Sequence, residues 1–186
     1  VDARIEEEDP FCIVFLFPCG PWNSLTEFNA ARYPHVRERV TEARKKHIPM
    51  LKWVAKRARD RVKKGRITIL ENGVASRAYR LDFLEELDGL EDGMIADALF
   101  EYVVGDQCML RQHDRESGEL MRGRTKWGTN STKLKHILAT ECDGAHHHQQ
   151  IFGSNRFGPR SAQKAEWPAT MCRHILRGIV QEMALS

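Results

Sequence analysis

The sequence predicts an α/β fold: a mostly parallel sheet in a three-layer arrangement, with an antiparallel hairpin near the C-terminus. The first observation is that Phe11–Phe17 is apolar at every position, which is typical of a strand buried on both faces. The second is that a similar short strand, Ile67–Leu70, comes after a long helical pattern. A strand, a helix and a strand in this order predict a right-handed parallel unit.

The helix of this unit is expected from about Tyr33 to Lys64. Pro49 lies inside this pattern and should kink or split the helix, and Gly65 is a suitable stop. Apolar residues recur at steps of three to five, with basic residues on the other faces. They are Val36, Val40, Ala43, Ile48, Leu51, Val54, Ala58 and Val62.

The next segments predict a helix and then a hairpin. Ser76–Leu87 is expected to be a helix capped by Ser76, and Gly89 and Gly93 should break the chain after this helix. Tyr102–Leu110 and Leu120–Trp127 are candidate strands. The polar segment Asp114–Glu119 between them contains Gly118 and predicts the turn.

The C-terminal part is expected to form a short helix, an irregular loop and a final helix, in this order. A short helix is predicted at Ser131–Ala139, and 141–163 is predicted to be an irregular, His-rich loop. The last helix is expected over Pro168–Leu185, since Pro suits a first turn. Its inward residues should be Met171, Ile175, Leu176, Ile179 and Met183.

Composition points to one ordinary globular domain spanning 1–186. Of 186 residues, 41% are hydrophobic and 30% charged, which excludes disordered and collagen-like classes. No apolar run approaches the roughly 20 residues of a membrane span, and the acidic start does not resemble a signal peptide. Five cysteines without a disulfide-framework spacing favour an intracellular location, nuclear or cytoplasmic.

The net charge of +3 conceals a strongly basic segment. The segment from Arg37 to Arg66 contains thirteen Lys and Arg residues and three acidic residues. Its net charge is therefore +10, and the net charge of the rest of the chain is −7. Such density predicts contact with nucleic-acid phosphates, although a solvated helix face is the alternative. The candidate contacts are Lys52, Lys56, Arg57, Arg59, Lys63 and Lys64.

One pair of residues could carry covalent chemistry. Cys19 comes after the first predicted strand, and Glu71 ends the second. Carboxyl ends of neighbouring parallel strands meet at one sheet edge, where α/β proteins bind ligands. A thiol nucleophile beside a carboxyl acid suits attack on a ring with protonation of its nitrogen. The alternative is a cysteine at the core edge and a glutamate at a strand end, without chemistry.

These motifs resemble the catalytic half of cytosine-5 DNA methyltransferases. The Pro18-Cys19 loop resembles the loop that carries the family's nucleophile, and Glu71-Asn72 resembles its Glu-Asn-Val motif. Arg122 and Arg124 match the two arginines of a supporting Gln-x-Arg-x-Arg strand. The resemblance implies a Rossmann-like fold, attack by Cys19 on C6 of cytosine, and protonation at N3 by Glu71.

A more extensive resemblance, from about Glu8 to Leu176, is to a domain of copia-like retrotransposon polyproteins of dinoflagellates. That domain carries a Pro-Pro-Cys-Gly-Pro-Trp-Ser loop, an Asp-Gln-Cys strand and a Cys-x3-His-x-His segment. Asp106-Gln107-Cys108 and Cys142–His148 match the last two. The resemblance implies a retroelement-derived domain that acts on nucleic acid.

The chain departs from the methyltransferase pattern at several positions. Phe17 replaces the first proline of the loop, Gly73 the valine of Glu-Asn-Val, and Leu120 the glutamine of the arginine strand. The family's cofactor half precedes the Cys loop, whereas ten residues precede Phe11 here. S-adenosylmethionine is therefore expected only if a missing or partner segment supplies its pocket.

A second candidate site is a metal centre. Cys142, His146 and His148 lie within seven residues, and Cys108 lies on a nearby predicted strand. Two thiolates and two imidazoles would form a closed zinc site that orders the irregular loop. His147, Cys172 and His174 are rival ligands, and a polar surface loop with exposed histidines is the alternative.

Three functions remain open from the sequence. The first is a methyltransferase-like domain acting on nucleic acid through Cys19 and Glu71. The second is a non-catalytic nucleic-acid-binding or assembly module that uses the basic helix over 37–66. The third is a cysteine hydrolase that pairs Cys19 with a histidine, for which the candidates are His47, His113 and His174.

Overall fold

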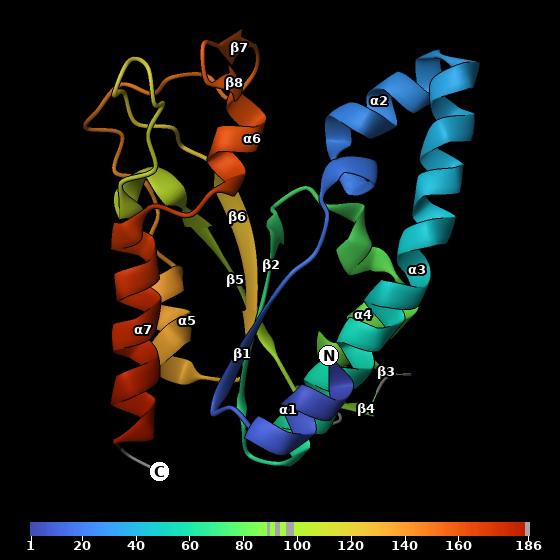
Figure 1. Cartoon of the computed structure of the whole chain (residues 1–186), viewed down its shortest axis with the longest axis vertical. Coiled ribbons are helices and arrows are strands. Elements are labelled where there is room, and N and C mark those ends of the chain that lie inside the picture. Colours follow the sequence, from blue (N-terminus) through green and yellow to red (C-terminus); the bar gives the residue numbers. More distant parts are fainter. Residues whose placement is uncertain (89, 92–93, 96–98, 185–186) are drawn as a thin grey trace. The chain divides into compact units, whose positions relative to one another are not determined.

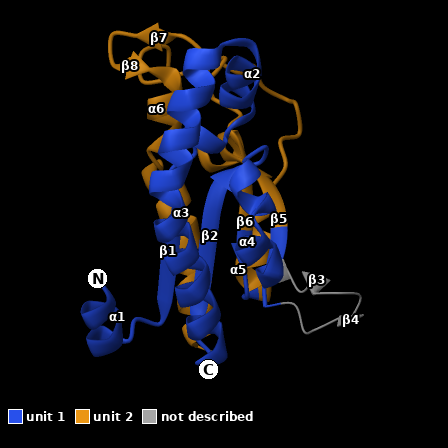
Figure 2. Ribbon diagram, turned by 90° about the vertical axis from the view of Figure 1, so that its right-hand side faces the viewer, with its two compact units in different colours: residues 1–102, 128–131 blue, residues 103–127, 132–186 orange. Residues whose placement is uncertain are grey.

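The computed structural model describes the chain except residues 89, 92–93, 96–98 and 185–186 (Figure 1). The chain is α/β, with two compact units (Figure 2). Unit 1 comprises 1–102 and 128–131, and unit 2 comprises 103–127 and 132–186. Four strands form a mixed sheet in the order β1-β2-β6-β5. They are β1 (Cys12–Leu16), β2 (Ile67–Gly73), β5 (Glu101–Asp106) and β6 (Arg124–Thr129).

The predicted parallel unit is present in unit 1. β1 pairs with β2 in parallel, and the register runs from Cys12 opposite Ile67 to Leu16 opposite Glu71. The connection includes helix α3 (Pro34–Lys63), whose Leu51 is fully buried. The expectation that β1 is buried on both faces is wrong, because Leu16 is 55% exposed and β1 lies at one edge of the sheet.

Of the kink or split predicted at Pro49, the split does not occur, because α3 continues through this residue. Proline removes one backbone hydrogen bond of a helix, but the buried apolar stripe of α3 continues on both sides of it and anchors the helix. Two other helices are not predicted by the sequence pattern. α2 (Ser24–Arg32) begins at a cap, where Asn23 Oδ1 accepts from the Thr26 N–H at 2.7 Å. α1 (Asp2–Glu8) buries no side chain.

The helix expected at Ser76–Leu87 is interrupted. Ser76 does cap it, since its hydroxyl accepts from the Ala78 N–H at 3.4 Å. The segment then forms a 3-10 turn, a short α-helix and another 3-10 turn: η2 (Arg77–Arg80), α4 (Asp82–Glu85) and η3 (Glu86–Asp88). The short strands β3 (Leu90–Glu91) and β4 (Met94–Ile95) come next as an antiparallel pair. The predicted breaks at Gly89 and Gly93 lie outside the described residues.

The mostly parallel, Rossmann-like layout is not confirmed, because the sheet is mixed and mostly antiparallel. β1 and β2 are joined by a crossover helix, whereas the segment from β5 to β6 contains a turn. In this turn the Asp114 N–H donates to the Glu119 carbonyl at 2.9 Å, and His113 bridges to Leu120. The predicted hairpin turn is thus present. Both strands are shorter than expected, and β5 leads into the 3-10 helix η4 (Gln107–Leu110).

The helices of unit 2 are α5 (Thr132–Leu138), α6 (Arg160–Ala165) and α7 (Ala169–Met183). On α7, Met171 and Ile175 are buried as predicted. Leu176 and Met183 are 58% and 53% exposed, so their predicted inward orientation is wrong. No helix in the described part of the chain is both long and apolar enough to cross a membrane.

The segment 141–163 is irregular in its first part alone. Its second part contains the hairpin strands β7 (Ser154–Asn155) and β8 (Gly158–Pro159), and α6 comes directly after them. Two of its glycines, Gly153 and Gly158, have positive φ angles of 83° and 100°. Such angles favour glycine, and they permit tight turns in a segment that the sequence predicts as an irregular loop.

Candidate metal centre

Four side chains of unit 2 converge as the sequence predicts. Among the described residues, Cys108, Cys142, His146 and His148 form a group whose ligand atoms all lie within 4.8 Å of one another. Cys108 is buried in η4, directly after β5, and the other three lie half-buried in the irregular loop. The group could therefore hold a metal ion.

The two distances from the Cys142 sulfur to the ligand histidines match tetrahedral coordination. The Cys142 Sγ atom lies 3.4 Å from His148 Nε2 and 3.7 Å from His146 Nε2. Zinc–sulfur and zinc–nitrogen bonds of about 2.3 and 2.1 Å at a tetrahedral angle separate the two ligand atoms by about 3.6 Å. Both imidazoles thus present the same nitrogen at the spacing that a shared ion requires.

A second layer of contacts orients these ligands. The Cys142 N–H donates to Asp106 Oδ2 at 2.9 Å, and the Gly144 N–H donates to the Cys142 sulfur at 3.3 Å. Gly144 has a φ of 74°, which lets the chain turn back over that sulfur. Asp143 Oδ1 lies 3.8 Å from His146 Nδ1, the nitrogen that a metal bound at Nε2 leaves free.

The electrostatics of the cluster oppose ionisation of a thiol without a cation. Burial, together with the neighbouring Cys142 and Asp106, raises the pKa of Cys108 to about 12. A divalent cation reverses this balance, because a thiol that coordinates a metal binds it as thiolate and releases its proton to solvent. The arrangement is thus suited to a bound cation.

The rival ligands lie outside this group. His147, between the two ligand histidines, is exposed. His174 Nδ1 lies 2.8 Å from the Thr170 carbonyl oxygen of its own helix, and Cys172 is also on α7. The four-residue set proposed from the sequence therefore holds without substitution.

Arg122 and Arg124 contact the buried Asp106 in unit 2. An Arg122 Nη2 atom lies 3.1 Å from Asp106 Oδ2, and Arg124 Nε lies 3.4 Å from Oδ1. Burial alone would raise the pKa of Asp106, but the Cys142 N–H and Arg122 outweigh it and lower that pKa. Sequence reasoning assigned Asp106 no role, although its position two residues before a candidate ligand is a usable signal.

The Cys19 edge of unit 1 has the predicted arrangement of strands. Glu71 stands opposite Leu16 at the carboxyl ends of β1 and β2, and Cys19 comes three residues later. The buried Asn72 amide donates to the Phe17 carbonyl at 2.7 Å, which ties the Cys19 loop to β2. Cys19 itself is exposed.

A cavity of about 310 Å³ lies beside this loop in unit 1. Its lining includes Gly20 and Pro21, which come directly after Cys19, and residues of α2 and α3. The volume is at the lower end of the roughly 300–1,000 Å³ of small-molecule sites.

Most of the predicted nucleic-acid contacts, which lie on α3 and at its C-cap Lys64, have acidic partners inside unit 1. Lys56 pairs with Asp60, and Lys52 lies over the Phe83 ring. Three others contact acidic residues that are distant in the sequence: Arg57 with Asp2 and Glu6, Arg59 with Glu86, and Lys64 with Glu6. Lys63 is exposed.

The chain matches no protein-family model, no curated protein and no solved structure. The geometry of the two sites therefore carries the functional argument.

Proposed function

We propose that the protein binds one zinc ion through Cys108, Cys142, His146 and His148, and that this zinc holds unit 2 together. The observation that carries the proposal is the convergence of four ligand atoms within 4.8 Å. Four protein ligands leave no position for water or substrate, which is typical of structural rather than catalytic zinc. Two thiolates with two imidazoles favour zinc over magnesium or calcium, which prefer oxygen ligands.

The test is metal content and ligand geometry. Protein purified without chelator should contain about one zinc per chain. Replacement by Co²⁺ should give the visible absorption of tetrahedral cobalt together with sulfur-to-cobalt charge transfer. Both signals should be lost in His148→Gln.

The chain supplies matched controls for this experiment. His147→Gln changes the neighbouring histidine, and Cys172→Ser removes a cysteine outside the cluster. Both should keep full zinc content. Zinc below one-tenth per chain in the unmodified protein, or equal loss in His147→Gln and His148→Gln, would contradict the assignment.

A second function is supported by the parallel register of β1 and β2. We propose that unit 1 is methyltransferase-like and acts on nucleic acid, with Cys19 as nucleophile and Glu71 as acid. The Cys19 thiolate would add to C6 of a pyrimidine, and the Glu71 carboxyl group would protonate N3, giving a neutral adduct. The exposed thiol and the Asn72 tether support this role.

The adduct can be trapped without a methyl donor. A DNA duplex with 2-pyrimidinone in place of one cytosine is open to thiol addition at C6. Incubation should give a covalent protein–DNA complex on a denaturing gel, and Cys19→Ser should abolish it. Glu71→Gln should slow its formation at least tenfold, as expected for loss of a general acid, while Cys172→Ser should react normally. An adduct that persists in Cys19→Ser would remove Cys19 from the proposal.

A further inference from the structure

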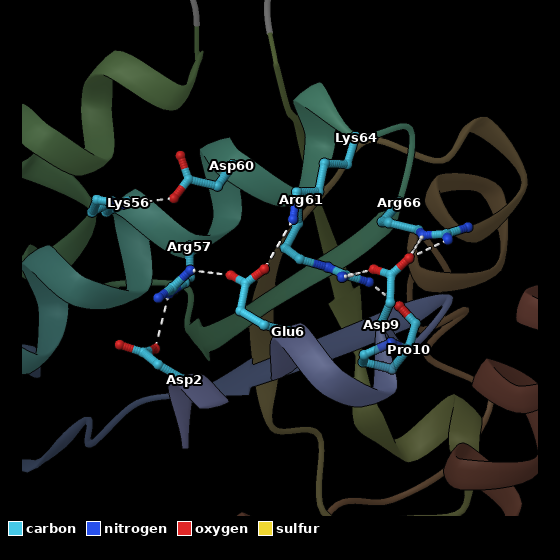
Figure 3. Close-up of polar contacts among 10 residues, drawn as sticks. All are labelled: Asp2, Glu6, Asp9, Pro10, Lys56, Arg57, Asp60, Arg61, Lys64 and Arg66. Atoms are coloured by element: carbon cyan, nitrogen blue, oxygen red, sulfur yellow. Dashed lines mark hydrogen bonds and ion pairs between the residues drawn. The ribbon is translucent and has the colours of Figure 1, made fainter. Parts of the chain in front are cut away.

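The acidic helix α1 lies against the basic C-terminal half of α3 in unit 1 (Figure 3). Asp2 Oδ1 accepts from Arg57 Nε at 2.9 Å and from Trp53 Nε1 at 2.7 Å. Ion pairs thus connect α1 to residues about fifty positions later in the sequence. The carboxylates of α1 neutralise part of the segment that the sequence marks as basic.

Glu6 occupies this surface in the way that a phosphate group would. Its Oε1 accepts from Arg57 Nη1 at 2.8 Å, and its Oε2 accepts from Lys64 Nζ at 3.1 Å (Figure 3). Arg57 lies on α3 and Lys64 directly follows its last residue, and both cations reach the same Glu6 carboxylate. One anion with two oxygens therefore bridges two cations, as the two non-bridging oxygens of a phosphodiester can.

Helix α1 is weakly attached to this surface. It has seven residues, none of them buried, and Asp2 and Glu6 are each 50% exposed. An isolated helix of this length is unstable in water, and salt screens ion pairs whose carboxylates are half-exposed. The surface can exchange α1 for another anion.

Asp9 is the residue about which α1 could swing away from α3. This residue ends α1 in the left-handed conformation, with a φ of 34°. Its carboxylate is held by Arg61 and Arg66, so it stays in place independently of Asp2 and Glu6. Displacement of α1 would leave β1 undisturbed and uncover Arg57 and Lys64.

We propose that Arg57 and Lys64, flanked by Lys56 and Lys63, bind the phosphodiester backbone of nucleic acid, and that α1 competes with it for this surface. The inference rests on the nucleic-acid binding proposed above and specifies where it occurs and what opposes it. Binding of nucleic acid releases condensed counterions, and this release increases its affinity for the surface. The carboxylates of α1 have no such counterion atmosphere to release. A long polyanion therefore displaces a helix that carries few charges.

The test compares two double variants of α1 that remove the same charge. Asp2→Asn with Glu6→Gln removes the carboxylates that contact α3, whereas Glu7→Gln with Glu8→Gln leaves those contacts intact. Binding of a fluorescein-labelled 20-base-pair DNA duplex is measured by anisotropy at 50 and 150 mM NaCl. The first variant should bind about tenfold more tightly than the unmodified protein, and the second less than threefold. Adding Arg57→Ala and Lys64→Ala to the first variant should cancel the gain.

The outcomes separate this inference from the proposed function. Equal gains in the two double variants would show a net-charge effect and overturn the competition by α1, while nucleic-acid binding would stand. No binding by any variant at 50 mM NaCl would overturn both. Displacement of the duplex by poly-glutamate at equal charge concentration would assign the surface to acidic proteins and overturn the choice of nucleic acid.

Discussion

Removal of the metal with a chelator is expected to lower the midpoint of thermal unfolding of the protein by about 8–16 °C. A ligand present at a thousand times its dissociation constant stabilises the folded state by about 4 kcal/mol. For a chain of this size, each kcal/mol corresponds to about 2–4 °C. The measurement is a thermal scan of protein purified with zinc, before and after treatment with a chelator.

The effect should be large because the loop has little else to order it. From Glu141 to Gly153, a stretch that the structure describes in full, the chain has no helix or strand, and Phe152 is 72% exposed. Ordering each backbone residue costs about 1–2 kcal/mol. A metal that joins Cys108 to the loop offsets this cost where apolar burial does not.

The controls identify the cause of the shift. Returning zinc to the chelated protein should restore the original midpoint. His148→Gln should resemble the chelated protein and respond to neither treatment, whereas His147→Gln should behave as the unmodified protein. An unchanged midpoint after confirmed removal of the metal would show that the loop is ordered by other contacts.

The sequence predicts elements whose pattern is local. The apolar run from Phe11 to Phe17 indicates the strand β1, although β1 is less buried than this run predicts. The repeat of apolar residues indicates α3, whose apolar face is buried. The metal cluster was predictable for a related reason. Cys142, His146 and His148 are close in sequence, and few other constraints place such residues together.

The features that the sequence does not predict depend on contacts between residues distant in the sequence. Helix α1 is stabilised by ion pairs to α3, and no periodicity within Asp2–Glu8 predicts them. On α7, the apolar repeat is wider than the face that packs against α5, so Leu176 and Met183 are exposed. Pattern alone does not say how much of an apolar stripe the neighbouring elements cover.

Asp114→Ala is expected to lower the free energy of unfolding by about 3–5 kcal/mol, the usual cost of breaking a buried ion pair by removing one partner. The Asp114 side chain is fully buried in unit 2. It accepts from the N–H groups of Glu116 and Ser117 at 2.9 Å and from Arg160 Nε at 2.7 Å. Asn155 Nδ2 also donates to it, at 2.9 Å. The variant should remove the ion pair of Arg160 on α6 and the hydrogen bond from Asn155 on β7. The hairpin turn would then lose its contacts with β7 and α6 through this carboxylate.

The same carboxylate predicts an acid limit to stability. The backbone N–H of Ser117 contributes most to lowering the pKa of Asp114 to about 2, with Glu116 and Arg160 adding to it against the opposing effect of burial. A pKa below the ordinary value of 3.8 means that the ionised form is favoured by folding. The contribution is therefore complete above about pH 4 and is lost as the pH falls towards 2. Asp114→Asn should flatten this part of the stability–pH curve.

Glu119→Ala is the matched control, because Glu119 lies in the same turn with its side chain exposed. Its free energy of unfolding should stay within about 0.5 kcal/mol of the unmodified protein, as for most surface substitutions. Denaturant unfolding at pH 7 and pH 3 measures both effects. If Asp114→Ala and Glu119→Ala lose equal stability, the network around Asp114 does not hold the turn to β7 and α6. The order of 154–165 would then depend on the metal loop and the packing of α6.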